Sequence, residues 1–557
     1  MRTVFNLLRD SYEQCPDRDT IILQSLEGDV RIPYRDLLDR AAAYAVAFQE
    51  AGIRRGEPVV LLLQHGRPLI EGFFGAILHG AIPSIMPFLT EKLSAERYRN
   101  SLKSLIQITQ PGAIVTYPEF IGEVQQTRVE GDSVRHVFNH SEVVSPTAWS
   151  WEQLGGASSM PEDIVLLQHS SGTTGLQKGV ALSHKAVRNQ VDSYARAIKM
   201  DQEDVVVSWL PLYHDMGLIA GFIMPILMRS KLVLMSPFDW VRAPYRLMQA
   251  VSNYSGTLSW LPNFAYNFCA KKIRTRDLEG VDLSSWRGVI NCSEPMRWES
   301  HHLFYERFKE FGLRRESLTT CYAMAENVFA VTQGGIEAAT SVDEIDRSAL
   351  QSERIARPSS RTDRTVKMLS AGRPIDNTRV RVINESEDDV PDRHIGEILI
   401  QGNCLLSGYY NRPELAEDSF LEGWYRTGDL GYLADGELFV TGRQKELIIV
   451  GGKNIHPQDL EEIMNDIEGV HPGRVVAFGV FNDEIGTEDI VLIAESAIHQ
   501  AEEKASLARE IRAQIAQSSD VTARYVEIVE REWLIKTSSG KIARGANREK
   551  YLQNQRG

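Results

Sequence analysis

The sequence predicts an α/β protein with a large N-terminal domain of several subdomains and a small, mobile α+β domain at the C-terminal end. Three observations support this fold class. Strand-like apolar runs alternate with helical patterns through the middle of the chain, the composition turns polar after about residue 335, and a separate pattern of strands and helices begins near residue 443. The chain has 557 residues, enough to bury several cores without disulfide or metal support.

The alternation of strands and helices is clearest between residues 204 and 322. The run DVVVSWL at 204–210 predicts a strand, and the apolar stretch at 217–228 predicts a buried helix. Further strands are expected at 231–236, 257–261, 286–292 and 318–322, and further helices at 244–254, 263–271 and 298–311. Strands separated by helices in this way form largely parallel sheets.

The pattern changes beyond residue 335. Residues 334–367 are polar and charged with few apolar positions, which indicates an inserted surface segment rather than core. Strands are expected at 396–401, 437–441, 447–450, 475–480, 490–494 and 524–529, and helices at 457–467 and 501–517. We therefore expect two domains, residues 1–442 and residues 443–557.

Charge and cysteine content disfavour several classes of protein. Acidic residues outnumber basic ones by 75 to 61, and the net charge of −14 argues against a nucleic-acid partner. The five cysteines form no C-x-x-C pair, which fits a reducing cytoplasm better than a disulfide framework or a zinc site. The N-terminus does not have the pattern of a signal peptide, and the longest apolar run, 216–228, is too short for a transmembrane segment. We expect a cytoplasmic protein.

The sharpest local motif is HSSGTTGLQKG at residues 169–179, directly after the apolar run at 164–167. Small residues let backbone N–H groups converge on an anion, hydroxyl groups add donors, and a lysine adds positive charge. The Walker A pattern is not met, because Gln177 precedes the lysine and Gly179 follows it. The candidate phosphate-binding residues are Ser170, Ser171, Gly172, Thr173, Thr174, Gly175 and Lys178.

This motif resembles the phosphate loop of the adenylate-forming superfamily, which includes acyl-CoA ligases and luciferases. Six further blocks similar to those of the family follow in the family's order, and the resemblance covers nearly the whole chain from about residue 20. The blocks are YHDMG (213–217), NCSEP (291–295), YAMAE (322–326), YRTGDLG (425–431), GRQKE (442–446) and SSGKI (538–542). The resemblance implies ATP-dependent activation of a carboxylic acid to an acyl-adenylate, with ATP and Mg²⁺ as cofactors.

The implied reaction needs positioned charge more than acid–base groups. A carboxylate oxygen attacks the α-phosphorus of ATP and pyrophosphate leaves; the acid is already ionised at neutral pH, so no general base is required. The barrier is the crowding of negative charge, which positioned cations relieve. The resemblance implies that Lys541 bridges the substrate carboxylate and the α-phosphate, that Glu326 holds Mg²⁺, and that His214 gates the carboxylate pocket.

The resemblance also implies a nucleotide pocket and a hinge. Tyr322 would stack on adenine, Asp429 would accept both ribose hydroxyls, and Arg443 would neutralise the nucleotide from the domain junction. Lys445 follows the last expected strand of the large domain and is the candidate hinge for rotation of the C-terminal domain. The other residues expected around the adenine base are Ser293, Glu294, Pro295, Ala323 and Met324.

Several features resemble the fatty acyl-AMP ligase branch of the superfamily. The segment LPNFAY at 261–266 lies where that branch forms its acyl pocket, and its candidate pocket residues are Asn263, Phe264 and Tyr266. Gly372 follows Glu326 by 46 positions, a longer stretch than is usual in acyl-CoA ligases. In that branch an insertion here impedes the domain rotation that CoA transfer needs. We therefore expect a fatty acid substrate and, as partner, an acyl carrier protein or the carrier domain of a polyketide or peptide synthase.

Some positions depart from the family pattern, and alternatives stay open. Gln177, His169 and Lys536 replace residues that are common in relatives, and Cys292 and Ser293 replace a more usual Gly-Ala, but none of these changes removes a charge that the mechanism needs. The nearest alternative is an acyl-CoA ligase. A nucleotide-binding regulatory homologue without activity and a luciferase-type oxygenase also remain. A serine hydrolase is disfavoured because no G-x-S-x-G motif occurs.

Overall fold

A nine-stranded sheet forms the centre of the structure, a computed structural model that describes residues 2–25, 27–87, 95–170, 178–359, 365–450, 453–482, 487–519, 521–537 and 540–556. In spatial order its strands are β17 (Arg373–Pro374), β14 (Ala330–Gln333), β13 (Leu318–Ala323), β12 (Gly288–Asn291), β11 (Leu258–Leu261), β9 (Val205–Ser208), β10 (Lys231–Met235), β1 (Asp19–Gln24) and β2 (Asp29–Pro33). The neighbours from β13 to β1 all pair in parallel, which confirms the α/β prediction for the middle of the chain.

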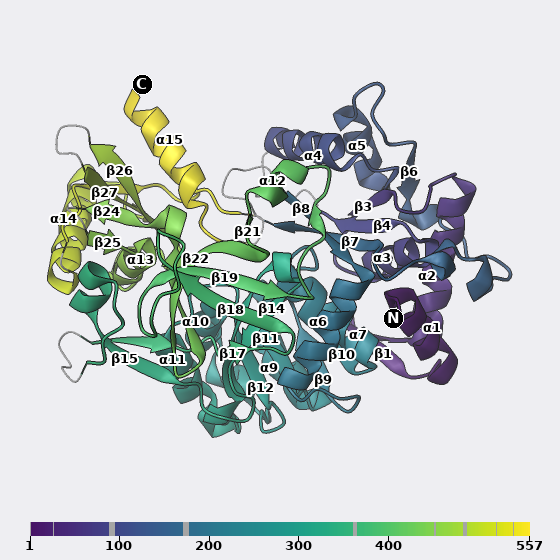
Figure 1. The fold of residues 1–557 in the computed structure, drawn as a ribbon, viewed down its shortest axis with the longest axis horizontal. Coiled ribbons are helices and arrows are strands. Elements are labelled where there is room, and N and C mark those ends of the chain that lie inside the picture. Colours follow the sequence, from purple (N-terminus) through teal and green to yellow (C-terminus); the bar gives the residue numbers. More distant parts are fainter. Residues whose placement is uncertain are drawn as a thin grey trace.

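A second sheet has seven strands and lies on the N-terminal side of the first (Figure 1). Its strands, in spatial order, are β20 (Gly408–Tyr409), β8 (Lys178–Ser183), β7 (Ile164–Ser170), β4 (Ile82–Ile85), β3 (Pro58–Leu62), β5 (Ala113–Thr116) and β6 (His136–Asn139). β8 runs antiparallel to β7, whereas the strands from β7 to β6 are parallel. The candidate phosphate loop, residues 171–177, connects β7 to β8 and lies outside the described residues.

Helices cover both sheets, and most of them share one hydrophobic core with the sheets; the helices at 95–109 and 121–127 pack instead with β3 and β5 in a separate cluster. Buried residues from Val4 to Leu438 form a single contiguous cluster, so the two sheets are parts of one body. The helices are α1 (Val4–Gln14), α2 (Tyr34–Glu50), α3 (Arg67–His79), α4 (Ala95–Thr109), α5 (Ile121–Thr127), α6 (His184–Ala197), α7 (Met224–Met228), α8 (Pro237–Arg242), α9 (Tyr245–Tyr254), α10 (Asn263–Lys272), α11 (Trp298–Phe308) and α12 (Pro413–Glu417).

A third sheet is antiparallel and lies between the large sheets and the C-terminal elements (Figure 1). It consists of β18 (Thr378–Ile383), β19 (Gly396–Gly402), β22 (Trp424–Ala434), β21 (Phe420–Leu421) and β23 (Glu437–Arg443). The last of these strands pairs with β22 and places Asp429 directly opposite Arg443. The two residues therefore come together through strand register, although they are 14 positions apart.

The polar segment at 334–367 is more ordered than its composition indicates. It contains β15 (Val342–Asp346) and a short π-helical turn, η10 (Ala349–Glu353), and β15 pairs with β16 (Thr365–Leu369). Ile345 and Ala356 are fully buried in a small cluster with Tyr432 and Phe439 of the third sheet. The expectation of a surface segment without core was therefore wrong for these positions. The reason is that a few widely spaced apolar residues suffice when a neighbouring sheet supplies the rest of the cluster.

The C-terminal elements gather at one end of the molecule, at the left of Figure 1. They are β24 (Ile448–Val450), β25 (Lys453–Ile455), α13 (Pro457–Asn465), β26 (Val475–Asn482), β27 (Thr487–Glu495), α14 (Ala501–Ser518), β28 (Tyr525–Val529) and α15 (Arg544–Arg556), and they follow a short turn, η11 (Gln444–Glu446). Two hydrophobic clusters are built entirely from residues beyond 447. This part of the chain therefore has cores of its own, separate from the large cluster.

The apolar stretch after the YHDMG block forms two helical pieces. Residues Met216–Ile223 form a π-helical segment, η5, which continues into α7. A Cβ atom added at Gly217 would lie 2.2 Å from the carbonyl oxygen of Pro211, and one added at Gly221 would lie 2.7 Å from Ser208 Oγ. The two glycines therefore let the helix press against the end of β9. This close approach fixes His214 and Asp215 at the start of the helix.

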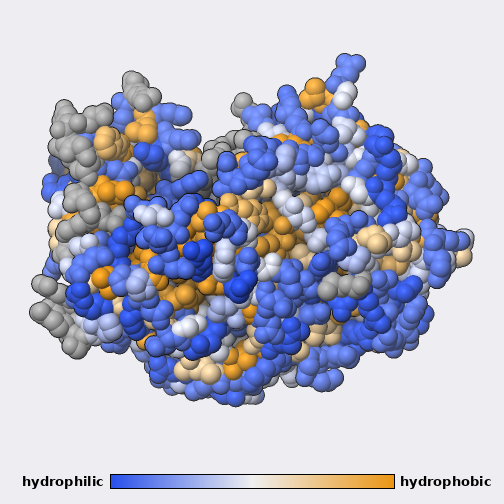
Figure 2. Space-filling model, viewed as in Figure 1, coloured by the Kyte–Doolittle hydropathy of each residue, from blue (hydrophilic) through white to orange (hydrophobic). Residues whose placement is uncertain are grey.

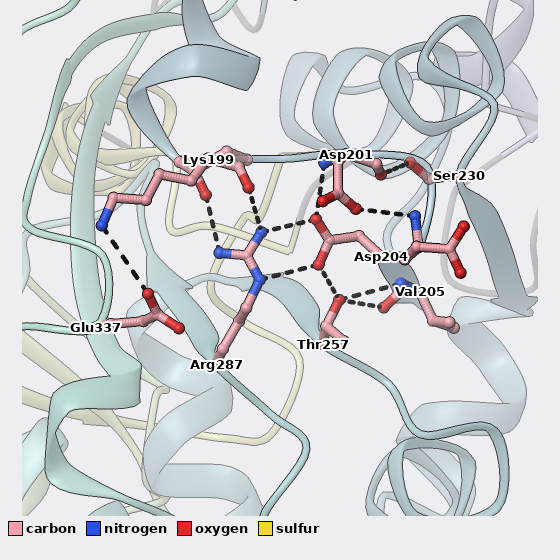
Figure 3. A network of polar contacts seen from close by, with 10 residues as sticks. Lys199, Asp201, Asp204, Val205, Ser230, Thr257, Arg287 and Glu337 are labelled. Carbon is pink, nitrogen blue, oxygen red and sulfur yellow. Dashed lines mark hydrogen bonds and ion pairs between the residues drawn. The ribbon is translucent and has the colours of Figure 1, made fainter.

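A polar network holds the starts of several elements together (Figure 3). Arg287 forms a bidentate ion pair with Asp204, with distances of 2.9 Å from Nε to Oδ1 and 2.7 Å from Nη2 to Oδ2. Its guanidinium also donates to the carbonyl oxygens of Ile198 and Lys199, and Thr257 Oγ1 donates to Asp204 at 2.6 Å. The network thus connects the end of α6 with the starts of β9, β11 and β12.

The surface seen in Figure 2 is mostly hydrophilic, with apolar patches between the charged side chains. None of the helices in the described part of the chain is both long and apolar enough to cross a membrane.

Candidate active site

Three residues from different elements meet at the end of β13. Tyr322 donates its hydroxyl hydrogen to Asp429 Oδ2 at 2.5 Å, and Arg443 Nε donates to Asp429 Oδ1 at 2.9 Å. Burial raises the pKa of Tyr322 far above its usual value, and the charge of Asp429 adds to this effect. The same carboxylate raises the pKa of Arg443. The arrangement places an aromatic ring, a carboxylate and a permanent cation side by side.

Glu326 lies in a short turn, η9 (Ala325–Asn327), immediately after β13 and Met324. Its Oε1 accepts a hydrogen bond from the hydroxyl of Tyr409 at 3.2 Å, and Tyr409 is also bonded to the Tyr425 hydroxyl at 2.8 Å. Burial raises the pKa of Glu326 above its usual range, an effect that the Tyr409 bond partly offsets. The ammonium group of Lys178 lies 4.9 Å from the centre of the Tyr409 ring.

These groups fit a magnesium–nucleotide complex. Mg²⁺ is usually held by one or two carboxylates together with substrate phosphates, and a half-buried glutamate and a lysine that both contact Tyr409 provide a hard oxygen ligand and a phosphate partner. Glu326 is the residue that would hold the ion, and Lys178 lies beside it on Tyr409. When bound, the ion would neutralise phosphate charge.

Lys541 reaches this region from the far end of the chain. Its ammonium group donates to the backbone carbonyl oxygen of Ser293. Burial raises the pKa values of Asp215 and Glu294. The positive charge of Lys541 lowers both pKa values and so partly offsets the effect of burial. Burial, with a smaller contribution from Lys541, lowers the pKa of His214 to about 3, so the imidazole is neutral near pH 7. A cation, two carboxyl groups and a neutral imidazole therefore lie close to one another.

An aromatic cluster lies next to this charged group. The backbone N–H of Phe264 donates to Glu294 Oε2 at 2.9 Å, and the Phe264 ring packs edge-on against Trp209 and Trp240. The two indole rings are stacked, with centroids 3.5 Å apart and an interplanar angle of 5°. Phe268 packs against Trp240 with ring centroids 5.3 Å apart. Together these rings form an apolar wall beside the carboxyl groups.

The other two candidate acyl-pocket residues have structural contacts. Asn263 Oδ1 accepts hydrogen bonds from Asn291 Nδ2 and from the backbone N–H of Arg297, so it ties α10 to the end of β12. Tyr266 is fully buried, and its hydroxyl donates to the carbonyl oxygen of Val289 at 3.0 Å. In this conformation Tyr266 is a core residue packed against His301 and Phe304, and its role in the pocket stays a prediction.

The structure brings several of the predicted residues together. As described above, the ammonium group of Lys541 contacts the carbonyl oxygen of Ser293. Its charge also affects the pKa values of His214, Asp215 and Glu294, so these groups lie near it. Residues 171–175 of the phosphate loop lie outside the described part, as does the side chain of Ser170. The remaining candidates are placed as follows: Ala323 ends β13, Met324 donates its backbone N–H to Phe329, Pro295 is exposed, and Lys445 lies in η11.

Sequence reasoning missed several neighbours of the site. Asp215 lies inside the YHDMG block and Tyr425 begins the YRTGDLG block, but the resemblance assigns a role to neither, and Tyr409 lies in none of the blocks. Trp209 lies in the predicted strand at 204–210 and Trp240 precedes the predicted helix at 244–254, so neither pattern indicates that the two rings stack. Their grouping depends on contacts between distant parts of the chain, and a linear pattern does not reveal such contacts.

Ion pairs connect the C-terminal elements to the rest of the protein. Arg297, at the start of α11, contacts Asp459 Oδ1 and Glu462 Oε2 of α13, each at 2.9 Å. From the 334–367 segment, Arg347 donates to the carbonyl oxygen of Ser518 at the end of α14. These contacts hold the C-terminal elements in the orientation in which Lys541 reaches Ser293.

The fold and the site define an enzyme that activates acids with a nucleotide, in which a small C-terminal part supplies a lysine. Residues 8–410 match the AMP-binding enzyme family, and the chain belongs to this family, on its fatty acyl-AMP ligase branch. It is an acid-activating ligase.

Curated relatives match over nearly the whole length. The medium-chain-fatty-acid–acyl-carrier-protein ligase JamA of Moorena producens is 30% identical over 99% of this chain and 95% of its own length. The long-chain-fatty-acid–AMP ligase FadD26 of Mycobacterium tuberculosis is 30% identical over 99% of this chain and 97% of its own length.

Solved structures have the same fold. A structure from a study of fatty acyl-adenylate ligases from E. coli and L. pneumophila superposes with a TM-score of 0.90, at 28% identity, and covers 100% of this chain and 99% of its own. The fatty acyl-adenylate ligase from L. pneumophila in complex with acyl adenylate and pyrophosphate has a TM-score of 0.74, at 27% identity, with coverage of 99% and 96%.

Proposed function

We propose that this protein uses ATP to convert a fatty or related carboxylic acid into acyl-AMP, and then passes the acyl group to the phosphopantetheine thiol of a carrier protein or synthase. In the first step a carboxylate oxygen bonds to the α-phosphorus and pyrophosphate leaves. In the second step the thiol sulfur bonds to the acyl carbon, AMP leaves and the thiol proton is released.

The position of Lys541 is the observation that carries the proposal. It reaches the Ser293 carbonyl beside Asp215, Glu294 and the neutral His214. A positioned cation at this point offsets the charge that develops as two anions approach each other. Because Lys541 is 248 residues from Ser293 in sequence, its arrival there depends on the orientation of the C-terminal elements.

The nucleotide and metal roles follow from the neighbouring groups. Tyr322 stacks on the adenine, Asp429 accepts the ribose hydroxyls and Arg443 neutralises phosphate charge. Glu326 holds Mg²⁺, and Lys178 with residues 170–175 binds the phosphates. The hydrogen bonds among Tyr322, Asp429 and Arg443 support these assignments, since they keep the three side chains in fixed positions before the nucleotide arrives.

The carrier-protein acceptor is supported by the relatives and by the inserted segment. JamA is named as a ligase to acyl carrier protein, and TtuA of Teredinibacter turnerae is named in the same way. The segment at 334–367 contacts both the third sheet and the C-terminal elements, which would oppose rotation toward a CoA-binding orientation. CoA as acceptor is the second candidate, because a relative from Caulobacter vibrioides carries the name putative acyl-CoA synthetase.

The domain organisation belongs to this proposal. Residues 1–442 act as the adenylation domain, and residues 443–557 act as a mobile domain that turns about Lys445 and works in the cytoplasm. The separate hydrophobic clusters beyond residue 447 support independent movement, since a body with its own cores can turn without being rebuilt.

A pyrophosphate-release assay with short, medium and long carboxylic acids tests the first half-reaction. Product analysis with CoA and, in parallel, with a phosphopantetheinylated carrier protein tests the second. We expect ATP- and acid-dependent pyrophosphate release, acyl-AMP as the accumulating product, and transfer to the carrier but little acyl-CoA.

Each of the other possible results would favour one alternative to the proposed function. Absence of pyrophosphate release with every acid would favour a nucleotide-binding homologue without activity. Efficient formation of acyl-CoA would replace the carrier-protein reading with the acyl-CoA ligase. Light emission or oxygen uptake would indicate a luciferase-type reaction.

A further inference from the structure

Two stacked indoles in the apolar wall have buried N–H groups without an acceptor. Trp209 is 4% exposed and Trp240 is 0% exposed, and the Nε1 atom of each has no hydrogen-bond partner among the described residues. The rings lie parallel with centroids 3.5 Å apart, so both donors belong to one small region.

Other deeply buried tryptophans in the same core are satisfied. Trp260 Nε1 donates to the hydroxyl of Tyr194 at 2.8 Å, and Trp286 Nε1 donates to Ser259 Oγ at 3.1 Å. A buried indole N–H normally finds a partner, because leaving it unpaired loses the hydrogen bond that it made with water in the unfolded chain. Packing in the core therefore does not explain why the two adjacent indole N–H groups of Trp209 and Trp240 have no acceptor.

The position of the unpaired donors points to the acyl group of the substrate. Phe264 packs edge-on against both indoles, is 43% exposed, and donates its backbone N–H to Glu294. Glu294 lies close enough to Lys541 for the charge of the ammonium group to affect its pKa. The two indoles thus lie beneath an accessible ring whose backbone is bonded to a carboxyl group of the candidate active site.

We infer that Trp209 and Trp240 form a specificity subsite for an acid whose acyl chain carries a neutral oxygen acceptor, such as a hydroxyl or keto group. The inference rests on the proposed function and deepens it by naming the class of acid. The indole N–H groups donate to the chain oxygen, while Phe264 and Phe268 pack against the apolar carbons.

We expect the chain oxygen that accepts these hydrogen bonds to be uncharged, because the rings beside the two donors are aromatic and apolar. An ionised second carboxylate would lose its hydration against these rings, and the desolvation cost would exceed the gain from neutral N–H donors. A plain alkyl chain at these rings would leave both donors unpaired. A site with donors in place therefore favours the oxygenated acid over the plain acid.

The test compares dodecanoic acid with monohydroxy and mono-oxo dodecanoic acids in which the oxygen is moved along the chain. The measured quantity is kcat/KM for pyrophosphate release by the full-length protein. We expect at least one oxygenated acid to be preferred by about tenfold, the effect of one well-placed neutral hydrogen bond. The hydroxy and oxo series show which oxygen group the subsite accepts.

Single substitutions test whether the two indole N–H groups cause the preference for oxygenated acids. Trp240→Phe and Trp209→Phe keep an aromatic ring and remove the N–H donor, so each should lower the ratio of oxygenated to plain acid toward one. Trp286→Phe is the matched control, because it removes a buried indole N–H whose partner is Ser259, and it should keep the wild-type ratio. Thermal unfolding of each variant shows that the fold is retained.

The outcomes distinguish this inference from the proposed function. If wild-type protein uses plain and oxygenated acids equally well at every position, the inference is overturned while the proposed function stands, whatever the variants do. A wild-type preference that survives in both tryptophan variants also overturns it. If no acid supports pyrophosphate release, the proposed function fails and the inference fails with it.

Discussion

At the scale of single residues, the site is governed by a few charged groups that are removed from water. Burial raises the pKa values of Asp215, Glu294 and Glu326, and it lowers that of His214. Each shift disfavours the charged form, so positive charge in the neighbourhood acts with unusual strength. Lys541 is the cation placed among two of these carboxyl groups, and its removal should have a large effect.

The first prediction concerns Lys541→Ala. We expect adenylation to fall by about 10²–10³-fold, the usual loss when one preorganised donor is removed from a developing charge. Pyrophosphate release measures the effect, and thermal unfolding checks the fold. Lys504→Ala is the control, since Lys504 pairs with Glu530 at the surface and its loss should leave the rate unchanged. A folded Lys541→Ala protein with a near-normal rate would refute the assignment.

The second prediction concerns Glu326→Gln. An amide is a poor ligand for a hard dication, so the Mg²⁺ concentration for half-maximal pyrophosphate release should rise by about tenfold or more. Excess Mg²⁺ should restore part of the rate. Glu344→Gln, an exposed acid that pairs with Lys367, is the control and should show the wild-type titration. Identical magnesium dependence in all three proteins would show that Glu326 is not the metal residue.

At the scale of elements, the Arg287 network secures the starts of three parallel strands. It places one bidentate ion pair and three backbone or hydroxyl contacts where loops enter the central sheet (Figure 3). Removing one partner of such a pair leaves the other charged and enclosed, which costs more than the pair itself contributes.

The third prediction follows from this network. Arg287→Ala should lower the free energy of unfolding by about 3–5 kcal/mol, because Asp204 is 5% exposed and loses its counter-ion. Lys199→Ala is the matched control: Lys199 pairs with Glu337 at 4.0 Å on the surface, and its loss should change stability by less than about 1 kcal/mol. Chemical denaturation measures both. Equal small effects would mean that the network is solvated in solution.

The fourth prediction concerns the segment at 334–367. If its contacts bias the C-terminal elements toward the present orientation, Arg347→Ala, which loses the bond to Ser518, should increase acyl-CoA formation while adenylation is retained. A variant in which residues 347–362 are shortened should show a larger increase. Arg357→Ala is the control: Arg357 is exposed, and the change removes a surface pair with Glu353. No gain of CoA ligation in either test variant would leave the segment without this role.

The order of strands and helices could be predicted from the sequence because it depends on local periodicity. The strands at 231–236 and 257–261 match β10 and β11 within a residue or two at each end. The register that pairs Asp429 with Arg443 and the stacking of Trp209 on Trp240 could not be predicted, because both depend on contacts between separate elements. The same applies to Ile345, whose burial requires the third sheet.

At the scale of the whole molecule, the proposed hinge at Lys445 lies between the large hydrophobic cluster and the clusters of the C-terminal elements. Lys445 itself is part of η11, between β23 and β24. Rotation there would break the Arg297 pairs with Asp459 and Glu462. The two half-reactions should therefore respond differently to changes at this point.

The fifth prediction is that Lys445→Pro separates the half-reactions. Proline fixes φ near −65° and so restricts rotation at the hinge. We expect transfer to the carrier to fall more than pyrophosphate release, measured on the same preparation with a phosphopantetheinylated carrier protein. Lys445→Ala is the control and should keep both steps. Equal losses in both steps would indicate misfolding or a hinge elsewhere.

The pairing of β1 with β10 has a consequence for how the chain is made. Ile21 is aligned with Leu232, so β1, which can pair with β2 soon after it is made, has to wait for more than two hundred further residues before its other neighbour, β10, exists. At ribosomal elongation rates of about 5–20 residues per second, that delay is about 10–40 s. During this time β1 lacks β10 and α1 lacks its later contacts with α6 and α7, and Lys541 is added later still. The nascent chain is thus exposed to chaperones at its beginning and completes its site at its end.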